Sequence, residues 1–270
     1  MKRTLILLTF MCIIAASVWS EATRITLATT TSTENSGLLA VLLPPFEAKT
    51  GIRVDVVAVG TGAAIRLGQN GDADIILVHA PAAEAAFVEA GYGVNRRAVM
   101  HNDFVILGPS SDPAGVSGAR SATEAYRRLS TATSRSVSFV SRGDDSGTHK
   151  KERAIWAAAA IEPSGGWYKE VGQGMGAVLT LASEMGGYTL ADRGTFLAMR
   201  SKIDLVVQVE GDPVLFNPYS IIAVNPAVHA HSRYEDAMRL IAWVTSQEGQ
   251  AIIGGFRLQG EALFHPDAIP

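Results

Sequence analysis

The sequence has 270 residues, a formal net charge of −3, and 47% hydrophobic against 18% charged residues. Such a chain can fill the cores of one or two globular domains, which excludes an intrinsically disordered or coiled-coil protein. Its mildly acidic balance lacks the basic surface that nucleic-acid-binding proteins carry, so no nucleic-acid partner is expected.

Residues 1–22 have the pattern of a secretory signal peptide. Two basic residues precede an apolar run over residues 5–18, and small residues follow it. The run is shorter than the roughly 20 apolar residues that span a bilayer, so we expect cleavage and export rather than anchoring. The single cysteine, Cys12, lies in this run, and the mature chain is therefore expected to lack disulfides and thiolate chemistry.

The mature chain opens with a short predicted strand, residues 24–28, followed by the hydroxyl-rich run TTTST at residues 29–33. A helix start needs only one such side chain as its cap, so the surplus hydroxyls favour a ligand role over plain capping. An apolar helical pattern covers residues 38–50, and the pair Pro44-Pro45 is expected to split that helix.

A strand, a turn, a helix and a second strand follow as a predicted βαβ unit. The strands are residues 51–59 and 73–78, and the turn Gly60-Thr61-Gly62 leads into the helix. Ligands bind at the carboxyl ends of such parallel strands. The turn lacks the third glycine of a dinucleotide fingerprint and the Gly-Lys-Ser/Thr of a P-loop, so nucleotide binding is not expected.

The stretch VSFVSRGDDSGTHKKERAIWAAAA, residues 137–160, organises the rest of the chain. A predicted strand ends here in Ser, Gly and Thr residues just before a strongly helical segment. The first backbone N–H groups of a helix have no intrahelical partner, and the helix dipole adds partial positive charge there. With Arg142 as a formal counter-charge, this corner predicts half of a clamp for a small oxyanion.

Three further expectations concern other parts of the chain. Residues 92–102 are expected to be irregular. Arg193, at another strand-to-helix corner, could reach the ligand or pair with an acidic neighbour such as Asp192, and the sequence leaves both readings open. Thr245 and Glu248 are expected to form the capping box of a short C-terminal helix.

Five long stretches carry a resemblance to a known family. They are ATTTSTENSGLL (residues 28–39), AVGTGAAIRLGQNGDADIILVHAP (58–81), GYGVNRRAVMHNDFVILGP (91–109), FVSRGDDSGTHKKE (139–152) and YTLADRGTFLAM (188–199). Together, and in this order, they resemble the tungstate-binding proteins that feed an ABC importer, the TupA family.

The resemblance implies an α/β fold, the two-lobed periplasmic binding protein of type II with two crossing strands at the hinge. Residues 23–105 and 220–270 would form lobe I, and residues 106–219 lobe II. The implied protein is a periplasmic, monomeric, non-enzymatic component that captures tungstate, or also molybdate, without a cofactor. It would deliver the anion to the permease and ATPase subunits at the inner membrane.

The family motifs also imply which residues hold the oxyanion between the lobes. Carried onto this sequence, they are Thr30, Thr31, Ser32, Ser141, Arg142, Ser146, Gly147 and Thr148, with Thr61 and Arg193 as additions. These groups would bind the oxygens of the anion, and no metal-cation site is expected. Only the resemblance favours tungstate over molybdate, because the two anions share charge and shape.

Two alternatives stay open from the residues themselves. In a phosphate-binding protein, Asp144 or Asp145 would accept the proton of hydrogen phosphate, although either could equally stabilise a helix start. In a serine hydrolase, Ser146 would act with His149, but the motif is not Gly-x-Ser-x-Gly, and His149 is expected to face solvent. The six histidines of the chain lack the usual metal-ligand spacing.

Overall fold

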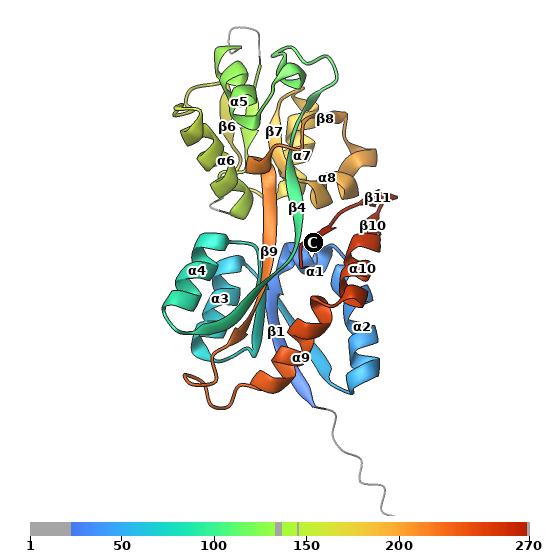
Figure 1. Cartoon of the computed structure of the whole chain (residues 1–270). Coiled ribbons are helices and arrows are strands. Elements are labelled where there is room, and N and C mark those ends of the chain that lie inside the picture. Colours follow the sequence, from blue (N-terminus) through green and yellow to red (C-terminus); the bar gives the residue numbers. More distant parts are fainter. Residues whose placement is uncertain (1–22, 133–136, 145, 269–270) are drawn as a thin grey trace, which may run out of the picture.

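The computed structural model describes residues 23–132, 137–144 and 146–268, so the expected signal peptide lies outside the described residues. Two α/β lobes lie one above the other and are joined by the long strands β4 and β9, which run through both (Figure 1). We call the lower one lobe I and the upper one lobe II. None of the helices in the described part of the chain reaches the length and apolarity of a membrane span.

Lobe I is built on a mixed sheet with the strand order β12-β4-β9-β3-β1-β2, in which β1 pairs in parallel with both β2 and β3. Its strands are β1 (Arg24–Thr30), β2 (Arg53–Val59), β3 (Ile75–Val78), β4 (Gly93–Pro109), β9 (Phe216–Val224) and β12 (His265–Pro266). Its helices are α1 (Thr31–Asn35), α2 (Leu38–Thr50), α3 (Thr61–Asn70), α4 (Pro81–Glu89), α9 (Tyr234–Val244) and α10 (Gln247–Gly255).

Lobe II surrounds the far end of β4. Its strands are β5 (Phe139–Ser141), β6 (Tyr168–Glu170), β7 (Thr189–Asp192) and β8 (Leu205–Val209). Its helices are α5 (Ala122–Thr131), α6 (Gly147–Ala158), α7 (Met175–Glu184) and α8 (Arg193–Met199), with short 3-10 turns η1 (Val116–Gly118), η3 (Arg200–Lys202) and η4 (Pro213–Leu215).

Strand β4 changes its partner where it passes from one lobe to the other. It pairs with β9 up to Asp103 and with β7 from Phe104 onward, while β8 joins it further along. The bounds expected from the sequence, at residues 105/106 and 219/220, fall on β4 and β9 and stay a prediction. What the pairing establishes is that both lobes share one continuous strand as their common frame.

The main strands of each lobe are buried on both faces, so consecutive residues of one strand enter different cores. In lobe I, Ile75 and Ile221 pack with α2, α9 and α10, whereas Ile76 and Ile222 pack with α3 and α4. Burial on both faces explains why these strands read as unbroken apolar runs. Leu258, on the small hairpin of β10 (Arg257–Leu258) and β11 (Glu261–Ala262), packs against a core cluster of each lobe.

Helix α2 is continuous through Pro44 and Pro45, so the expected split is wrong. A proline removes the hydrogen bond to the carbonyl four residues earlier. Those carbonyls belong to Ala40 and Val41, which are exposed, so water can replace the lost bonds. The buried face around Phe46 keeps the helix in place.

Residues 92–102 are mostly part of β4, which corrects the expectation of an irregular segment. The pairing with β9 is interrupted by bulges between Val94 and Arg97 and between Ala98 and Met100. Asn95 within the first bulge has a φ of +54°. A bulge shifts the alternation of inward and outward side chains, so the period of two that marks a strand is lost in the sequence.

The start of α10 is capped one residue later than expected. The cap is Ser246, whose Oγ accepts the Gly249 N–H at 3.1 Å. Thr245 instead ends α9, and its hydroxyl donates to the Ile241 carbonyl at 2.8 Å. The expected Thr245 cap is therefore wrong.

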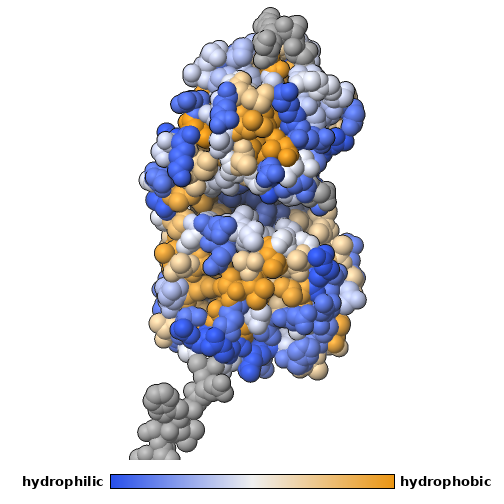
Figure 2. Space-filling model, turned by 180° about the vertical axis from the view of Figure 1, so that it is seen from behind, coloured by the Kyte–Doolittle hydropathy of each residue, from blue (hydrophilic) through white to orange (hydrophobic). Residues whose placement is uncertain are grey.

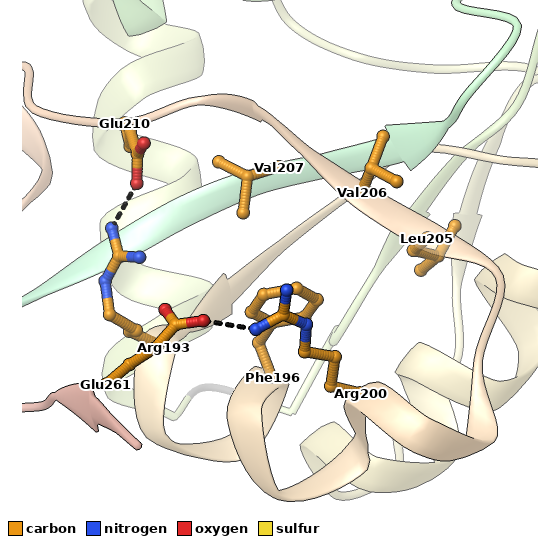
Figure 3. Close-up of a pocket in the computed structure, with 8 residues that line it drawn as sticks. All are labelled: Arg193, Phe196, Arg200, Leu205, Val206, Val207, Glu210 and Glu261. Atoms are coloured by element: carbon orange, nitrogen blue, oxygen red, sulfur yellow. Dashed lines mark hydrogen bonds and ion pairs between the residues drawn. The ribbon is translucent and has the colours of Figure 1, made fainter. Parts of the chain in front are cut away.

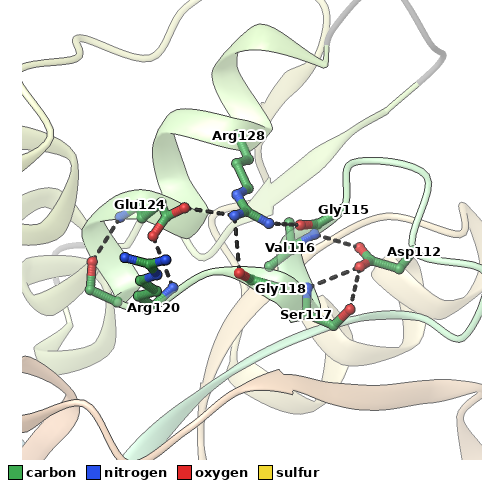
Figure 4. A network of polar contacts seen from close by, with 9 residues as sticks. Asp112, Gly115, Val116, Ser117, Gly118, Arg120, Glu124 and Arg128 are labelled. Atoms are coloured by element: carbon green, nitrogen blue, oxygen red, sulfur yellow. Dashed lines mark hydrogen bonds and ion pairs between the residues drawn. The ribbon is translucent and has the colours of Figure 1, made fainter.

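Polar contacts fasten the loop that follows β4 (Figure 4), and its Val116 is also buried in the core of lobe II. Asp112 accepts the N–H groups of Val116 and Ser117 at 2.8 and 2.9 Å. Arg128 of α5 donates to the Gly118 carbonyl at 3.0 Å and to Glu124 at 2.6 Å. The loop is thereby tied to the first helix of lobe II.

Tyr126 in the core of lobe II allows a test of how much a buried hydroxyl without a partner costs in stability. Its ring is fully buried, 4.2 Å from the Trp156 ring between centroids, and its hydroxyl has no hydrogen-bond partner among the described residues. We expect Tyr126→Phe to leave the free energy of unfolding unchanged or to raise it by up to about 1 kcal/mol, because a buried unpaired hydroxyl is removed. Urea denaturation measures the change.

Tyr188→Phe is the matched control. The Tyr188 ring is equally buried, but its hydroxyl donates to Asp112 at 2.7 Å and accepts the Ala114 N–H at 3.1 Å. Its removal should cost about 1–3 kcal/mol, because the Ala114 N–H loses its acceptor and Asp112 loses one of its donors. Equal losses in the two variants would contradict the prediction for Tyr126.

Candidate functional site

Three strands of lobe I end at one edge of the sheet and carry polar residues there. Thr30 is the last residue of β1, Thr61 lies two residues beyond β2, and His79 directly follows β3. Because β1 lies between β3 and β2 and all three are parallel, these residues share the carboxyl edge. Ligands of open α/β sheets bind at such an edge.

The hydroxyl-rich run divides into structural and exposed members. Thr29 is fully buried and donates to the Leu77 carbonyl at 2.7 Å. Thr30 is the cap of α1, and its Oγ1 accepts the Thr33 N–H at 3.3 Å. Thr31 and Ser32 are exposed at the start of α1. Capping thus uses one hydroxyl, and of the two exposed ones Ser32 Oγ lies 3.1 Å from Thr30 Oγ1.

The corner between β5 and α6 presents a second set of donors from lobe II. Ser146 is the cap of α6, and its Oγ accepts the His149 N–H at 3.3 Å. Accepting that bond uses a lone pair of Ser146, and its hydroxyl proton is directed at the neighbouring Asp144 carboxylate. Gly147 and Thr148 are the first helical residues, where N–H groups lack intrahelical acceptors.

Arg142 and Asp144 brace this corner. Arg142 Nε donates to Asp144 Oδ2 at 2.7 Å, and Asp144 Oδ1 accepts the Ser146 N–H at 3.1 Å. Burial acts to raise the pKa of Asp144, but the hydrogen bonds from Ser146 and the charge of Arg142 outweigh it and hold the pKa below its usual range. Asp144 therefore stabilises the turn before α6. Asp145 lies outside the described residues.

Ser141, also predicted as a ligand residue, directs its hydroxyl into the protein. It is fully buried and donates to Glu152 Oε2 at 2.9 Å. Glu152 also accepts the Tyr168 hydroxyl at 2.7 Å and the Trp156 Nε1–H at 3.3 Å, and burial raises its pKa. In this arrangement the Ser141 hydroxyl ties β5 to α6.

The two corners come together at His79. Its Nε2 lies 3.5 Å from Ser32 Oγ of lobe I. A Cβ placed on Gly147 of lobe II would lie 4.0 Å from His79 Cε1, so the start of α6 faces the imidazole. Seen from behind, the space-filling view shows a hollow between the lobes with hydrophilic residues at its lining (Figure 2).

Arg193 pairs with two carboxylates from other parts of the chain, and not with its neighbour Asp192. Its Nε and Nη2 donate to the two oxygens of Asp103, each at 2.6 Å, and Nη2 also donates to Glu210 at 2.6 Å. These partners raise its pKa further. The expected partner Asp192 caps α8 by accepting the Thr195 N–H at 2.8 Å. Arg193 as a ligand residue stays a prediction, with its charge matched inside the protein.

A pocket of about 250 Å³ lies beside Arg193 (Figure 3). Arg193 and Arg200 line it, but each is paired, with Glu210 and with Glu261. The second of these pairs joins lobe II to the β10–β11 hairpin. Because its cations are neutralised, this pocket is a poor place for a free anion.

Two histidines differ from the expectations. His149 was expected to face solvent, yet its side chain is only 15% exposed and its Nε2 lies 3.8 Å from Glu170 Oε1. His79 was not singled out, although its place directly after a buried parallel strand is a usable signal. Within residues 23–132, 137–144 and 146–268, no three His, Asp or Glu side chains group as a cation site.

The assembled corners offer mainly donors: exposed hydroxyls, N–H groups at a helix start, and a guanidinium. Such a set suits a ligand that is rich in acceptors and negatively charged. The Ser146 hydroxyl accepts from the backbone of His149, whereas a hydrolase needs the imidazole itself as the base.

Comparison with known proteins agrees with this chemistry. The PBP superfamily domain matches residues 17–248. The tungstate-binding protein TupA of Peptoclostridium acidaminophilum is 47% identical over 90% of this chain and 86% of its own. The structure of TupA from Desulfovibrio alaskensis G20 is 46% identical, with a TM-score of 0.84 over 91% of this chain and 99% of that one.

A structure described as the tungstate ABC transporter from Geobacter sulfurreducens is 53% identical, with a TM-score of 0.76 over 86% of this chain and 98% of that one. These matches extend over both lobes and confirm the two-lobed fold predicted from the sequence. The chain belongs to the PBP superfamily and, within it, to the TupA family of tungstate-binding proteins.

Proposed function

We propose that this protein captures tungstate between its two lobes and delivers it to the permease of an ABC importer. The observation that carries the proposal is the meeting of Ser32, His79 and Gly147, which brings a donor-lined corner of each lobe to one place. Relatives that are 46% and 47% identical and bear the name of tungstate-binding proteins support the choice of anion.

The proposed ligand contacts come from the donors that the two corners present. Arg142, Ser146, Gly147 and Thr148 act from lobe II. Thr30, Thr31 and Ser32 act from lobe I together with Thr61, at the edge to which β1 and β2 lead. We assign Ser141 and Arg193 supporting roles, because their donors are directed at carboxylates.

Binding would favour the closed arrangement of the lobes. A ligand shifts a conformational equilibrium only through contacts that differ between the two states. Here the donors of the two corners converge only when α6 lies against His79, so an oxyanion would stabilise the closed state. The strands β4 and β9 would form the hinge, close to the bounds 105/106 and 219/220.

The remaining properties follow from the same proposal. The protein would act as an exported, periplasmic monomer with no cofactor and no catalytic role, and its partners would be a permease and an ATPase at the inner membrane. Molybdate would compete with tungstate, because the two anions share charge and shape. Phosphate is the weaker candidate, since Asp144 already binds Arg142 and the Ser146 N–H.

Titration calorimetry of the Arg142→Ala variant tests the site. We expect a tungstate affinity lower by about tenfold to a hundredfold, because a charge-assisted hydrogen bond is lost. Arg153→Ala is the matched control, since Arg153 lies on the outer side of α6 in an exposed pair with Glu162. Wild-type affinity of Arg142→Ala at an unchanged melting temperature would remove Arg142 from the site. A stronger affinity for phosphate or sulfate than for tungstate would overturn the proposed ligand.

Two serine caps separate stability from binding. Ser146 and Ser246 each accept one N–H at the start of a helix, but only Ser146 lies at the proposed site. Ser146→Ala and Ser246→Ala should each lower the free energy of unfolding by about 1 kcal/mol. Only Ser146→Ala should also weaken tungstate binding, by roughly tenfold, because a donor to the anion is lost. Equal binding by the two variants would show that the Ser146 hydroxyl only caps α6.

A further inference from the structure

His79 lies where lobe I, lobe II and a crossing strand meet. Its Nε2 is 3.5 Å from Ser32 Oγ, and its Cε1 faces Gly147 at the start of α6. On its other side the ring stacks on Tyr219 of β9, with 4.6 Å between the centroids. The imidazole is therefore held in one plane by the hinge strand while its outer nitrogen points toward the proposed ligand.

A chain of side-chain amides fixes which nitrogen of His79 carries the proton. Nδ1 lies 3.1 Å from Asn217 Oδ1, and Asn217 Nδ2 donates to Asn102 Oδ1 at 2.8 Å. Because that second bond orients the Asn217 amide, its oxygen faces His79 and can only accept. Nδ1 must then be the donor, and the neutral ring keeps a lone pair on Nε2.

This lone pair is the exception in a site made of donors. Tungstate is a dianion that carries no proton and offers only acceptors, so an unprotonated Nε2 repels it. A protonated Nε2 would instead donate a charge-assisted hydrogen bond to one of its oxygens. The binding of such an anion and the protonation of His79 must therefore favour each other.

We infer that His79 is the proton-linked residue of the oxyanion site: its Nε2 takes up one proton from solvent as a dianion binds, and then donates to the anion. The inference rests on the proposed function and adds to it a specific ionisation. It concerns the oxygens of the anion, so no bond to the metal atom is involved.

The surroundings of His79 agree with a neutral ring in the ligand-free protein. Burial lowers its pKa below the ordinary 6.5, and the Asn217 hydrogen bond and nearby carboxylates only partly oppose this. A dianion beside the ring would outweigh these effects and raise the pKa. The titratable and charged groups on the elements around the ring are Glu84 of α4, which pairs with Arg96, Asp192 before α8, Tyr219 of β9, and His149, Lys150 and Lys151 of α6.

The sign of the pH dependence follows from linkage. The complex binds more protons than the free protein, so the affinity falls as the pH rises above the free pKa of His79. Between the free and the bound pKa, the dissociation constant should rise by up to about tenfold per pH unit. Hydrogen phosphate differs, because it brings its own proton and can donate it to the neutral Nε2 without any uptake.

Titration calorimetry with sodium tungstate tests the inference on the purified protein. The binding enthalpy is measured at about pH 7.5 in buffers of different ionisation enthalpy, and its slope gives the number of protons taken up. We expect close to one proton for the wild type and none for His79→Gln, whose amide can donate without ionising. The dissociation constant of that variant should change less than about twofold per pH unit between about pH 7 and 9.

Two control variants assign the proton. His101→Gln changes an imidazole outside the site that pairs with Asp267, and His149→Gln changes the one on α6. Both should keep the uptake of the wild type. Tungstate binding without proton uptake, or an uptake that His149→Gln abolishes and His79→Gln retains, would overturn the inference while the proposed function stands. No tungstate binding at all would overturn the proposed function and the inference with it.

If His79→Gln binds no tungstate, its melting temperature decides the interpretation. A folded variant that has lost tungstate binding while His101→Gln keeps it supports His79 as an essential donor. A melting temperature equal to that of the wild type shows that the loss of binding does not come from unfolding of the variant. If the variant is unfolded, the pH dependence of the wild-type dissociation constant alone decides: a constant value between about pH 7 and 9 overturns the inference.

Discussion

The start of a helix leaves backbone N–H groups that its own carbonyls cannot satisfy, and the proposed site depends on this constraint. In lobe I, α3 begins after Gly60, which has no side chain to cap it. In lobe II, α6 begins after Ser146, which satisfies one N–H. An oxyanion between the lobes supplies acceptors and the charge that a helix start prefers. The backbone alone thus favours an anion between the lobes, and the side chains determine which anion binds.

The crossing strands decide whether the two helix starts can face one anion. Asp103 is the last residue of β4 that pairs with β9, and it binds Arg193 at the start of α8. Removing either partner of such a partly buried pair would leave a charge without its counter-charge. The pair therefore attaches α8 firmly to the hinge strand β4. Leu258 packs against a core cluster of each lobe and so forms a second connection between the lobes.

The sequence predicted those features of the two corners whose signals are local. The corner around Arg142 could be predicted because the cap, the glycine and the helix follow each other directly in the chain. The partners of Arg193 could not, since Asp103 lies 90 residues away. His79 shows the same limit: its place after β3 was visible, but Asn217, 138 residues away, determines its proton. The continuous α2 and the bulged β4 were missed because exposure and strand pairing, both tertiary properties, overrode the local rules for proline and alternation.

A hydroxyl has one proton, and where that proton goes decides which residues can bind an anion. Thr29 gives its proton to the Leu77 carbonyl, and Ser141 gives its proton to Glu152. Ser146, in contrast, accepts from the backbone of His149 and directs its proton at Asp144, at the edge of the proposed site rather than in the core. The hydroxyls of this family motif are thus unequal, although their letters are the same. Only the hydroxyl protons that the fold leaves unused can be directed at a ligand. A site built in this way favours an anion that carries no proton of its own. For such an anion to bind, Nε2 of His79, an acceptor among these donors, must become a donor as well.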